Sequence, residues 1–260
     1  MSNVLDKVIK ILKLLIPKEN TKEWGASELA RRSGLPVGTV HRILLELKKQ
    51  DMVIQNDVTK KFRLGFLLIE LGFAARENLS ILELARPVLK DLAEQAQETA
   101  HITIQDGCDG VLIDKIETVH QLKVVEPVGM RTPLTQGALK KAILAFLPPD
   151  EVNNICQKIE KIYIKKGIPW KFSVVMEELC SIRESGYAIS YGEVTSGTVA
   201  IASPVFDCNG RVVATIGING PENRFAQKEL PQKIEYVKMA GAVLTKNIGG
   251  NDRIIRRYAE

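Results

Sequence analysis

One fifteen-residue stretch, SGLPVGTVHRILLEL at residues 33–47, constrains the fold of this 260-residue chain more than any other. Its second half repeats apolar residues at the i, i+3, i+4, i+7 spacing of one helix face: Val40, Ile43, Leu44 and Leu47. This stripe predicts a helix that packs on a core by one side only. The turn that opens the helix holds small and polar residues, which make a poor core, so it is expected to stay accessible.

A shorter helix is expected just before this one, over the segment SELARRSG. Ser27 is a suitable N-cap, because its hydroxyl can accept a hydrogen bond from the first turn. Leu29 and Ala30 are expected to point inward, and Gly34 follows where a helix end favours positive φ. Pro36 then lies near the start of the next helix, where its missing N–H costs little. Two short helices joined by a glycine-containing turn are typical of a helix-turn-helix.

Further elements flank this pair of helices. A first helix is expected to end before Pro17. Its apolar face would consist of Val4, Val8, Ile11, Leu12 and Leu15. After the pair, Met52–Gln55 and Lys61–Leu64 surround the polar residues NDVTKK and predict a hairpin. A linking helix is expected to follow from Gly65 to Arg76.

The positive charge of the chain is concentrated in its first quarter. Residues 1–65 hold 13 Lys and Arg against 7 Asp and Glu, a net charge of +6, whereas residues 66–260 hold 23 against 24, a net charge of −1. A basic segment beside a neutral one is the electrostatic pattern of an anion-binding head on a body with another role. A lysine-rich solvated face would give the same sum, so the charge alone does not decide.

Together, these features of the first 65 residues predict DNA binding. A helix held by its apolar stripe can place its first turn in a major groove, where base edges favour small or hydrogen-bonding side chains. Basic residues beside this helix and at the hairpin tip are placed to reach phosphates. The candidate DNA-contacting residues are Arg31, Arg32, Val37, Gly38, Thr39, His41, Arg42, Lys60 and Lys61. The alternative is a small helical bundle on which these charges are only solvated.

The rest of the chain predicts an α+β domain. Strand-like runs lie at residues 100–105, 111–117, 122–129, 187–193, 199–207 and 211–220. Helical patterns lie at residues 81–97, 138–147, 150–161, 173–185 and 227–246. The first of these helices must tolerate Pro87. Tight turns such as Asn209-Gly210 join several strands, so an antiparallel sheet with helices packed on it is expected.

The sequence offers little that points to an enzyme or a metalloprotein. His41, His101 and His120 fall in different segments, and no GxSxG motif, P-loop or evident carboxylate–base set is present, so no catalytic residues are predicted. The four cysteines lack CxxC spacing, which argues against a disulfide framework or a zinc site. No metal or cofactor is expected. His101 is expected to face the sheet as a hydrogen-bonded polar residue.

Membrane insertion is not expected either. No apolar run approaches the ~18 residues that a membrane span needs. The N-terminus is amphipathic, carries Asp6 and three lysines within its apolar part, and has no small-residue cleavage site, so it is not interpreted as a signal peptide. A cytoplasmic protein without a membrane partner is predicted.

Two long segments of the head carry a family resemblance. WGASELARRSGLPVGTVHRILLELKKQDMVIQ and the following FRLGFLLIELG resemble the winged helix-turn-helix of the IclR-type bacterial transcription regulators. The resemblance continues through ARPVLKDLAEQAQETAHITIQDG, VLIDKIE and SGYAISYGEVTSGTVAIASPVFDCNGRVVATIGINGP. It implies a winged helix-turn-helix domain over residues 1–65, a linker helix over 66–78 and a GAF-like antiparallel-sheet effector domain over 79–260.

The family's effector pocket can be transferred to positions of this chain. The resemblance implies that the pocket is formed by Met130, Ala138, Leu139, Ser190, Thr198, Ala200, Gly217 and Asn219. From the residues alone, the loop SGT could offer N–H and hydroxyl donors to a carboxylate, or could simply be a turn between strands. Where glyoxylate-responsive members have an acidic residue and a cysteine, this chain has Ser190 and Ala200. Another departure from the family's pattern is Lys140-Lys141-Ala142, where Gly-Lys-Ala is common among its members. The identity of the ligand is therefore left open.

The resemblance also implies the partners. Such proteins are homodimers or dimers of dimers that bind palindromic double-stranded operator DNA, and a small organic, aromatic or sugar acid alters this binding. We therefore predict a transcriptional regulator, with repression expected as the commoner outcome. The alternative is an architectural DNA-binding protein without an effector, which would leave a neutral domain of some 180 residues unexplained.

Overall fold

The computed structural model describes residues 4–17, 22–77 and 80–250, and divides into two compact units. One unit, here called the head, comprises residues 1–79, and the other, the body, comprises residues 80–260. Each has its own hydrophobic core, and each is described by itself below. The last residues of the expected linker helix and of the chain lie outside the described residues.

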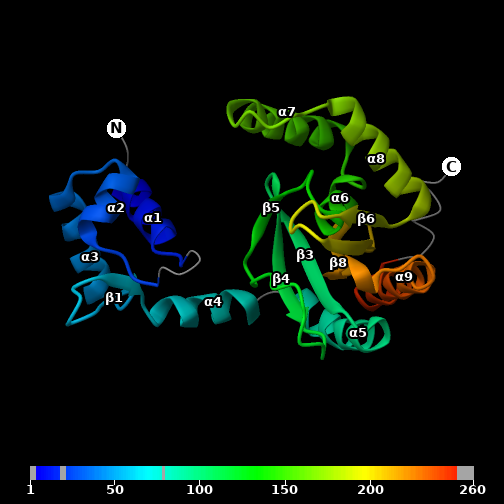
Figure 1. The fold of residues 1–260 in the computed structure, drawn as a ribbon, viewed down its shortest axis with the longest axis horizontal. Coiled ribbons are helices and arrows are strands. Elements are labelled where there is room, and N and C mark those ends of the chain that lie inside the picture. Colours follow the sequence, from blue (N-terminus) through cyan, green and yellow to red (C-terminus); the bar gives the residue numbers. More distant parts are fainter. Residues whose placement is uncertain (1–3, 18–21, 78–79, 251–260) are drawn as a thin grey trace. The chain divides into compact units, whose positions relative to one another are not determined.

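The head consists of helices followed by a two-stranded hairpin and a further helix (Figure 1). Its elements are α1 (Val4–Leu14), α2 (Ala26–Ser33), α3 (Val37–Lys49), β1 (Val53–Gln55), β2 (Phe62–Leu64) and α4 (Leu67–Glu77). The predicted stripe of α3 is confirmed, because all four of its apolar residues are buried. Trp24 joins the β1–β2 hairpin, here called the wing, by two backbone hydrogen bonds of 2.8 Å with Phe62. The connector before α2 is therefore held against the wing.

Two local predictions about the head were wrong. Helix α2 begins at Ala26 with Gly25 as its N-cap, so Ser27 lies inside the first turn and makes no capping hydrogen bond. The bridge between Trp24 and the hairpin fixes the chain just before Gly25, whose extended backbone already leads into the helix. Val4 was expected on the buried face of α1, but it is 68% exposed, and the buried face begins further along the helix. By contrast, Gly34 adopts the expected positive φ, 68°.

The body is built on a six-stranded antiparallel sheet with strand order β5-β4-β3-β8-β7-β6 (Figure 1). Its strands are β3 (Thr99–Asp106), β4 (Asp109–Ile116), β5 (Arg131–Pro133), β6 (Ala188–Tyr191), β7 (Thr198–Phe206) and β8 (Val212–Pro221). Its helices are α5 (Ser80–Ala96), α6 (Ala138–Leu144), α7 (Pro149–Lys165), α8 (Phe172–Ser185), the short η1 (Glu222–Arg224) and α9 (Leu230–Asn247).

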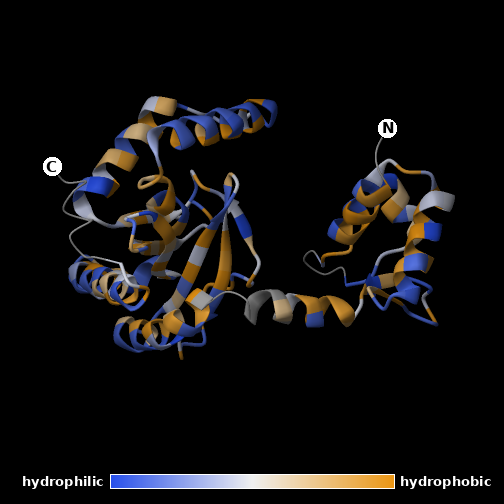
Figure 2. Ribbon diagram, turned by 180° about the vertical axis from the view of Figure 1, so that it is seen from behind, coloured by the Kyte–Doolittle hydropathy of each residue, from blue (hydrophilic) through white to orange (hydrophobic). Residues whose placement is uncertain are grey.

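The helices cover both faces of this sheet. Helix α6 lies against one face, where Thr215 of β8 donates a hydrogen bond to the Leu139 carbonyl. Helices α5 and α9 lie on the other face, where Gly241 of α9 approaches Ser203 of β7 (Figure 1). The strands between them are rich in hydrophobic residues (Figure 2), because residues on both sides are covered. The expected α+β architecture is therefore confirmed.

The structure corrects two elements of the body. Residues 122–129, expected as a strand, form no strand and end in a turn in which the Met130 N–H bonds to the Pro127 carbonyl and the Gly129 N–H donates to the Leu112 carbonyl of β4. The edge strand is instead the short β5, which follows this turn. Val124 and Glu126 are buried while Val125 is exposed, so the alternation reflects burial without strand pairing. Helix α9 begins at Leu230, three residues later than expected, because a turn precedes it.

Candidate DNA interface and effector cavity

The first turn of α3 is largely accessible, as the sequence predicted. Val37, Gly38, His41 and Arg42 are exposed, and Thr39 is half-buried. On the opposite side, Val40 is completely buried in the core of the head. The helix thus exposes a surface of small, polar and basic groups to solvent, and its apolar side packs on the core and holds the helix in place. This geometry suits insertion into a major groove, so α3 is called the recognition helix below.

The two arginines of α2 differ in how freely they can move. The side chain of Arg31 is 79% exposed, and its nearest acidic partner, Glu28, lies 3.9 Å away. Arg32 lies 3.1 Å from the same carboxylate and stacks 4.1 Å above the Trp24 ring. Arg31 is therefore free to reach a phosphate, whereas Arg32 also holds α2 against Trp24 in the connector that precedes this helix.

The wing carries its lysines at an ordered tip. Lys60 and Lys61 are exposed, and Lys60 has a positive φ of 54°. The amide of Asn56 donates to the Glu23 carboxylate at 3.1 Å, and its oxygen accepts the N–H of Thr59 at 3.0 Å. These contacts fix the turn that presents both lysines. Glu23 and Asn56 were not predicted as site residues, because they organise the tip without contributing positive charge.

In the body, most of the effector candidates come together from four elements of the fold. A small cavity lies between the start of α6, the loop after β6, and strands β7 and β8. It is lined by Glu126, Gly137, Ala138, Leu139, Lys140, Ser190, Glu193, Val194, Thr198, Ala200 and Asn219. Six of the eight predicted residues are in this lining. The free space inside is only ≈ 10 Å³, about the room of one water molecule, so a ligand requires the walls to move apart.

Met130 and Gly217 do not line this cavity. Gly217 lies on β8, where a Cβ would stand 2.2 Å from the Ile201 carbonyl oxygen, so the close approach of β7 explains the glycine. Met130 lies in the turn before β5 and accepts the N–H of Leu112. Sequence reasoning missed Glu126, Lys140 and other lining residues, since only the tertiary fold brings them to the cavity.

The start of α6 is held by side chains from the opposite wall. The Ala138 N–H donates to the Ser190 hydroxyl at 3.0 Å, and the Gly137 N–H donates to the Glu193 carboxylate at 2.8 Å. The other Glu193 oxygen pairs with Lys141 at 2.6 Å. The free N–H groups of a helix start attract anions, and here they are already engaged by protein oxygens.

A histidine supports the cavity from behind. His101 is fully buried, and its Nε2 lies 2.8 Å from the Asn219 Oδ1, as expected for a hydrogen-bonded polar residue of the sheet. Burial lowers the pKa of His101 from 6.5 to about 4, so the ring is neutral at pH 7. A neutral ring donates from Nε2 to Asn219, which leaves the Asn219 amide nitrogen available to the cavity.

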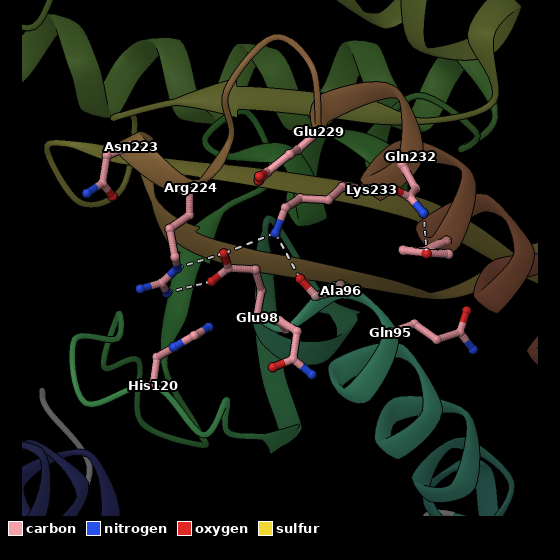
Figure 3. Close-up of a pocket in the computed structure, with 11 residues that line it drawn as sticks. Gln95, Ala96, Glu98, His120, Asn223, Arg224, Glu229, Gln232 and Lys233 are labelled. Atoms are coloured by element: carbon pink, nitrogen blue, oxygen red, sulfur yellow. Dashed lines mark hydrogen bonds and ion pairs between the residues drawn. The ribbon is translucent and has the colours of Figure 1, made fainter.

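A second pocket of the body is organised around a buried carboxylate (Figure 3). Glu98, between α5 and β3, is completely buried and pairs with Arg224 at 2.6 Å and Lys233 at 3.1 Å. Lys233 also donates to the Ala96 carbonyl at 2.8 Å. These contacts join α5, β3, η1 and the start of α9, so this group is called the Glu98 cluster. Its charges satisfy one another, which favours a structural role.

The described residues contain neither a cluster that could hold a metal ion nor a helix that could span a membrane. Within residues 4–17, 22–77 and 80–250, no group of three or more His, Cys, Asp or Glu side chains is arranged to hold a metal ion. The described helices include none that is both long and apolar enough to cross a membrane.

The two units correspond to two known domains. Residues 4–57 match the IclR helix-turn-helix domain, and residues 73–245 match the domain described as bacterial transcriptional regulator IclR C-terminal. The HTH-type transcriptional regulator KipR of Bacillus subtilis is 30% identical over 249 residues, covering 96% of this chain and 99% of KipR. The HTH-type transcriptional regulator KdgR of Escherichia coli is 29% identical over 248 residues, covering 95% of this chain and 94% of KdgR.

A solved structure agrees with these matches. The crystal structure of the Thermotoga maritima IclR has a TM-score of 0.73 and 27% identity to this chain, covering 95% of it and 99% of that protein. The matches to both domains and to relatives along nearly the whole chain all indicate the same family. The protein belongs to the IclR family of bacterial transcriptional regulators, so it is a DNA-binding regulator and not an enzyme.

Proposed function

We propose that this regulator is a repressor whose head binds operator DNA and whose body binds a small organic acid that alters this binding. The observation that carries the proposal is the meeting of residues from α6, β6, β7 and β8 in one cavity of the body. The relatives include HTH-type transcriptional repressors named AllR from Escherichia coli. Their names support repression as the outcome here.

For the head, the proposal assigns direct base contacts to the first turn of the recognition helix. Arg42 and His41 are its exposed hydrogen-bonding side chains, and Gly38 permits close approach to the groove. Arg31 and the wing lysines would contact phosphates on either side. The net charge of +6 over residues 1–65 supports this assignment, since phosphate contacts dominate affinity for DNA.

We also propose that the functional unit is a homodimer or a dimer of dimers in the cytoplasm, with two heads on the half-sites of a palindrome. Apolar side chains exposed on the head support pairing: Val4 and Leu5 of α1, and Phe66, Ile69 and Leu71 at and within α4. Such side chains gain from being covered by a second copy. Effector binding would shift the spacing of the two heads through α4.

The proposal is tested with the purified full chain and fragments of its source genome. Fragments that it retains at 150 mM salt are sequenced, and their affinities are measured by fluorescence anisotropy with a random fragment as the control. We expect a shared palindromic sequence bound at least about 1000-fold more tightly than the random fragment. Equal affinity for all fragments would instead favour an architectural protein.

The effector part is tested by thermal unfolding against a library of organic, aromatic and sugar acids. A bound acid raises the Tm of the chain and releases the operator fragment. If no acid changes either the Tm or the operator affinity, the sensor function is wrong even if operator binding is found.

A further inference from the structure

Two charged side chains line the effector cavity without a hydrogen bond or a close ion pair to another residue. Lys140 is 3% exposed and Glu126 is 6% exposed, and both face the same small cavity. In the described part of the chain, no ion pair within 4.0 Å and no hydrogen bond engages either side chain. The neighbouring Lys141 is different, because it pairs with Glu178 at 3.0 Å and with Glu193 at 2.6 Å.

The fold encloses Lys140 on α6. All seven residues of this helix are buried, and Lys140 keeps only 3% of its surface exposed. Its stem packs against Gly110 of β4, where a Cβ would lie 2.6 Å from the Lys140 Cγ. A residue without a side chain therefore stands where the stem passes, and Lys140 is at the same time part of the cavity lining.

This arrangement is costly in the absence of a ligand. Burial lowers the pKa of Lys140, while the nearby Glu126 charge opposes that shift. A buried charge without a hydrogen-bonding partner destabilises a protein strongly, and the cavity has room for about one water molecule only. Charges kept under these conditions are explained by a partner that arrives from outside.

The rest of the polar wall indicates what the partner presents. The Asn219 amide nitrogen and the Ser190 hydroxyl, which line the same cavity as the lysine, can donate hydrogen bonds, because their oxygens already accept from His101 and Ala138. These groups suit an anion. Glu126 is the opposite case, since an ionised carboxylate only accepts hydrogen bonds. An acid with no hydrogen-bond donor would pair with Lys140 but would leave Glu126 without a hydrogen-bonding partner.

We propose that the effector carries both a carboxylate and a hydroxyl or amine donor, and that Lys140 binds the first and Glu126 the second. This inference rests on the proposed effector function of the cavity and narrows its ligand to hydroxy acids or amino acids. Because the cavity is small, the two groups lie within a few bonds of each other.

The ligand arm of the test uses matched small probes on the full chain. Lactate and alanine each add one donor to propionate, and their effect on the Tm is measured over a concentration series. We expect lactate or alanine to give the same Tm shift as propionate at about tenfold lower concentration, as a hydrogen bond to a charged group predicts. Glu126→Gln should reduce this preference to less than about threefold, and Lys140→Met should remove the response to all three probes.

The stability arm needs no ligand. Met replaces the stem of Lys140 without its charge, and Gln replaces Glu126 at nearly the same volume. We expect the double variant K140M/E126Q to raise the Tm of the unliganded chain by about 3 °C, because two unpartnered charges are removed. Lys141→Met is the matched control and should lower the Tm, since it leaves Glu178 and Glu193 without their cation.

The outcomes separate this inference from the proposed function. If acids bind but Lys140→Met and Glu126→Gln respond as the unmodified chain does, the assignment of the two charges is wrong while the effector function stands. A lower Tm for K140M/E126Q would show an internal structural pair and also overturn the inference. If neither lactate nor alanine raises the Tm of the unmodified chain at a lower concentration than propionate, the inference is overturned, whatever the Tm of the double variant.

Discussion

The head and the body hold their charged side chains in opposite ways. In the head, the candidate DNA contacts Arg31, Arg42 and Lys60 lie at the surface. In the body, Glu98 and Lys140 are enclosed by the fold. Exposed positive charges can bind the phosphates of DNA and add little to the stability of the fold. An enclosed charge destabilises the fold unless a group of opposite charge or a hydrogen-bonding group compensates it. Substitutions in the head should therefore change DNA affinity, and those in the body should change stability.

The Glu98 cluster should show the largest effect on stability. Glu98→Gln removes the buried carboxylate that pairs with both Arg224 and Lys233, which leaves the buried Lys233 and the half-buried Arg224 without their anion. We expect a loss of about 3–5 kcal/mol in the free energy of unfolding, measured by urea denaturation of the full chain. Glu235→Gln is the control on α9, because its carboxylate is exposed, and it should change stability by less than about 0.5 kcal/mol. Equal losses would mean that enclosure does not matter.

His101 predicts how the stability of the body depends on pH. Its folded pKa is about 4 and its ordinary pKa is 6.5, so in this interval the unfolded chain binds a proton that the folded chain does not. Stability is therefore retained above pH 6.5 and falls as the pH drops towards 4, by about 3 kcal/mol from this group. His101→Gln should flatten that part of the stability curve. Parallel curves for the two proteins would contradict the buried neutral imidazole.

In the head, Arg42→Ala should weaken operator binding by about 1–3 kcal/mol, or roughly 5- to 150-fold. The free energy of unfolding should change by less than about 0.5 kcal/mol, because the side chain is exposed. Lys10→Ala on α1 removes the same charge away from the recognition helix and serves as the control. If both variants lose the same affinity, the assignment of base contacts to the first turn of α3 is wrong.

The smallest expected effect is at the tip of the wing. Lys60→Gln should reduce the slope of log affinity against log salt by about 0.9, as loss of one phosphate contact does. The loss should be equal for the operator and for random DNA, so the ratio of the two affinities stays constant. A change in that ratio would indicate that the wing contributes to sequence recognition.

Much of the fold could be predicted because its determinants are local. The stripe of α3 and the positive-φ glycine Gly34 act within a few residues, and each lies where the pattern indicated. Residues 122–129 misled because their alternating burial comes from the body around them rather than from strand pairing. A pattern of period two reports which side chains are covered, and does not by itself report a hydrogen-bonded neighbour.

The candidate sites were predictable to different degrees for the same reason. The first turn of α3 could be predicted because its exposure follows from the stripe beside it. The pairing of Glu98 with Arg224, 126 residues away, depends on the tertiary fold and left no local signal. Lys140 gave a partial signal, since two adjacent lysines inside the apolar run ALKKAILAFL cannot both reach water from a buried helix.

The proposed function requires that binding of an acid in the body and binding of DNA by the head are coupled. The most direct measurement is the effector's affinity for the full chain with and without a saturating operator fragment, beside the operator's affinity with and without saturating effector. Coupling requires that each ligand weaken the other by the same factor, and we expect about 5- to 150-fold. An effector affinity that is unchanged by bound operator would contradict the account.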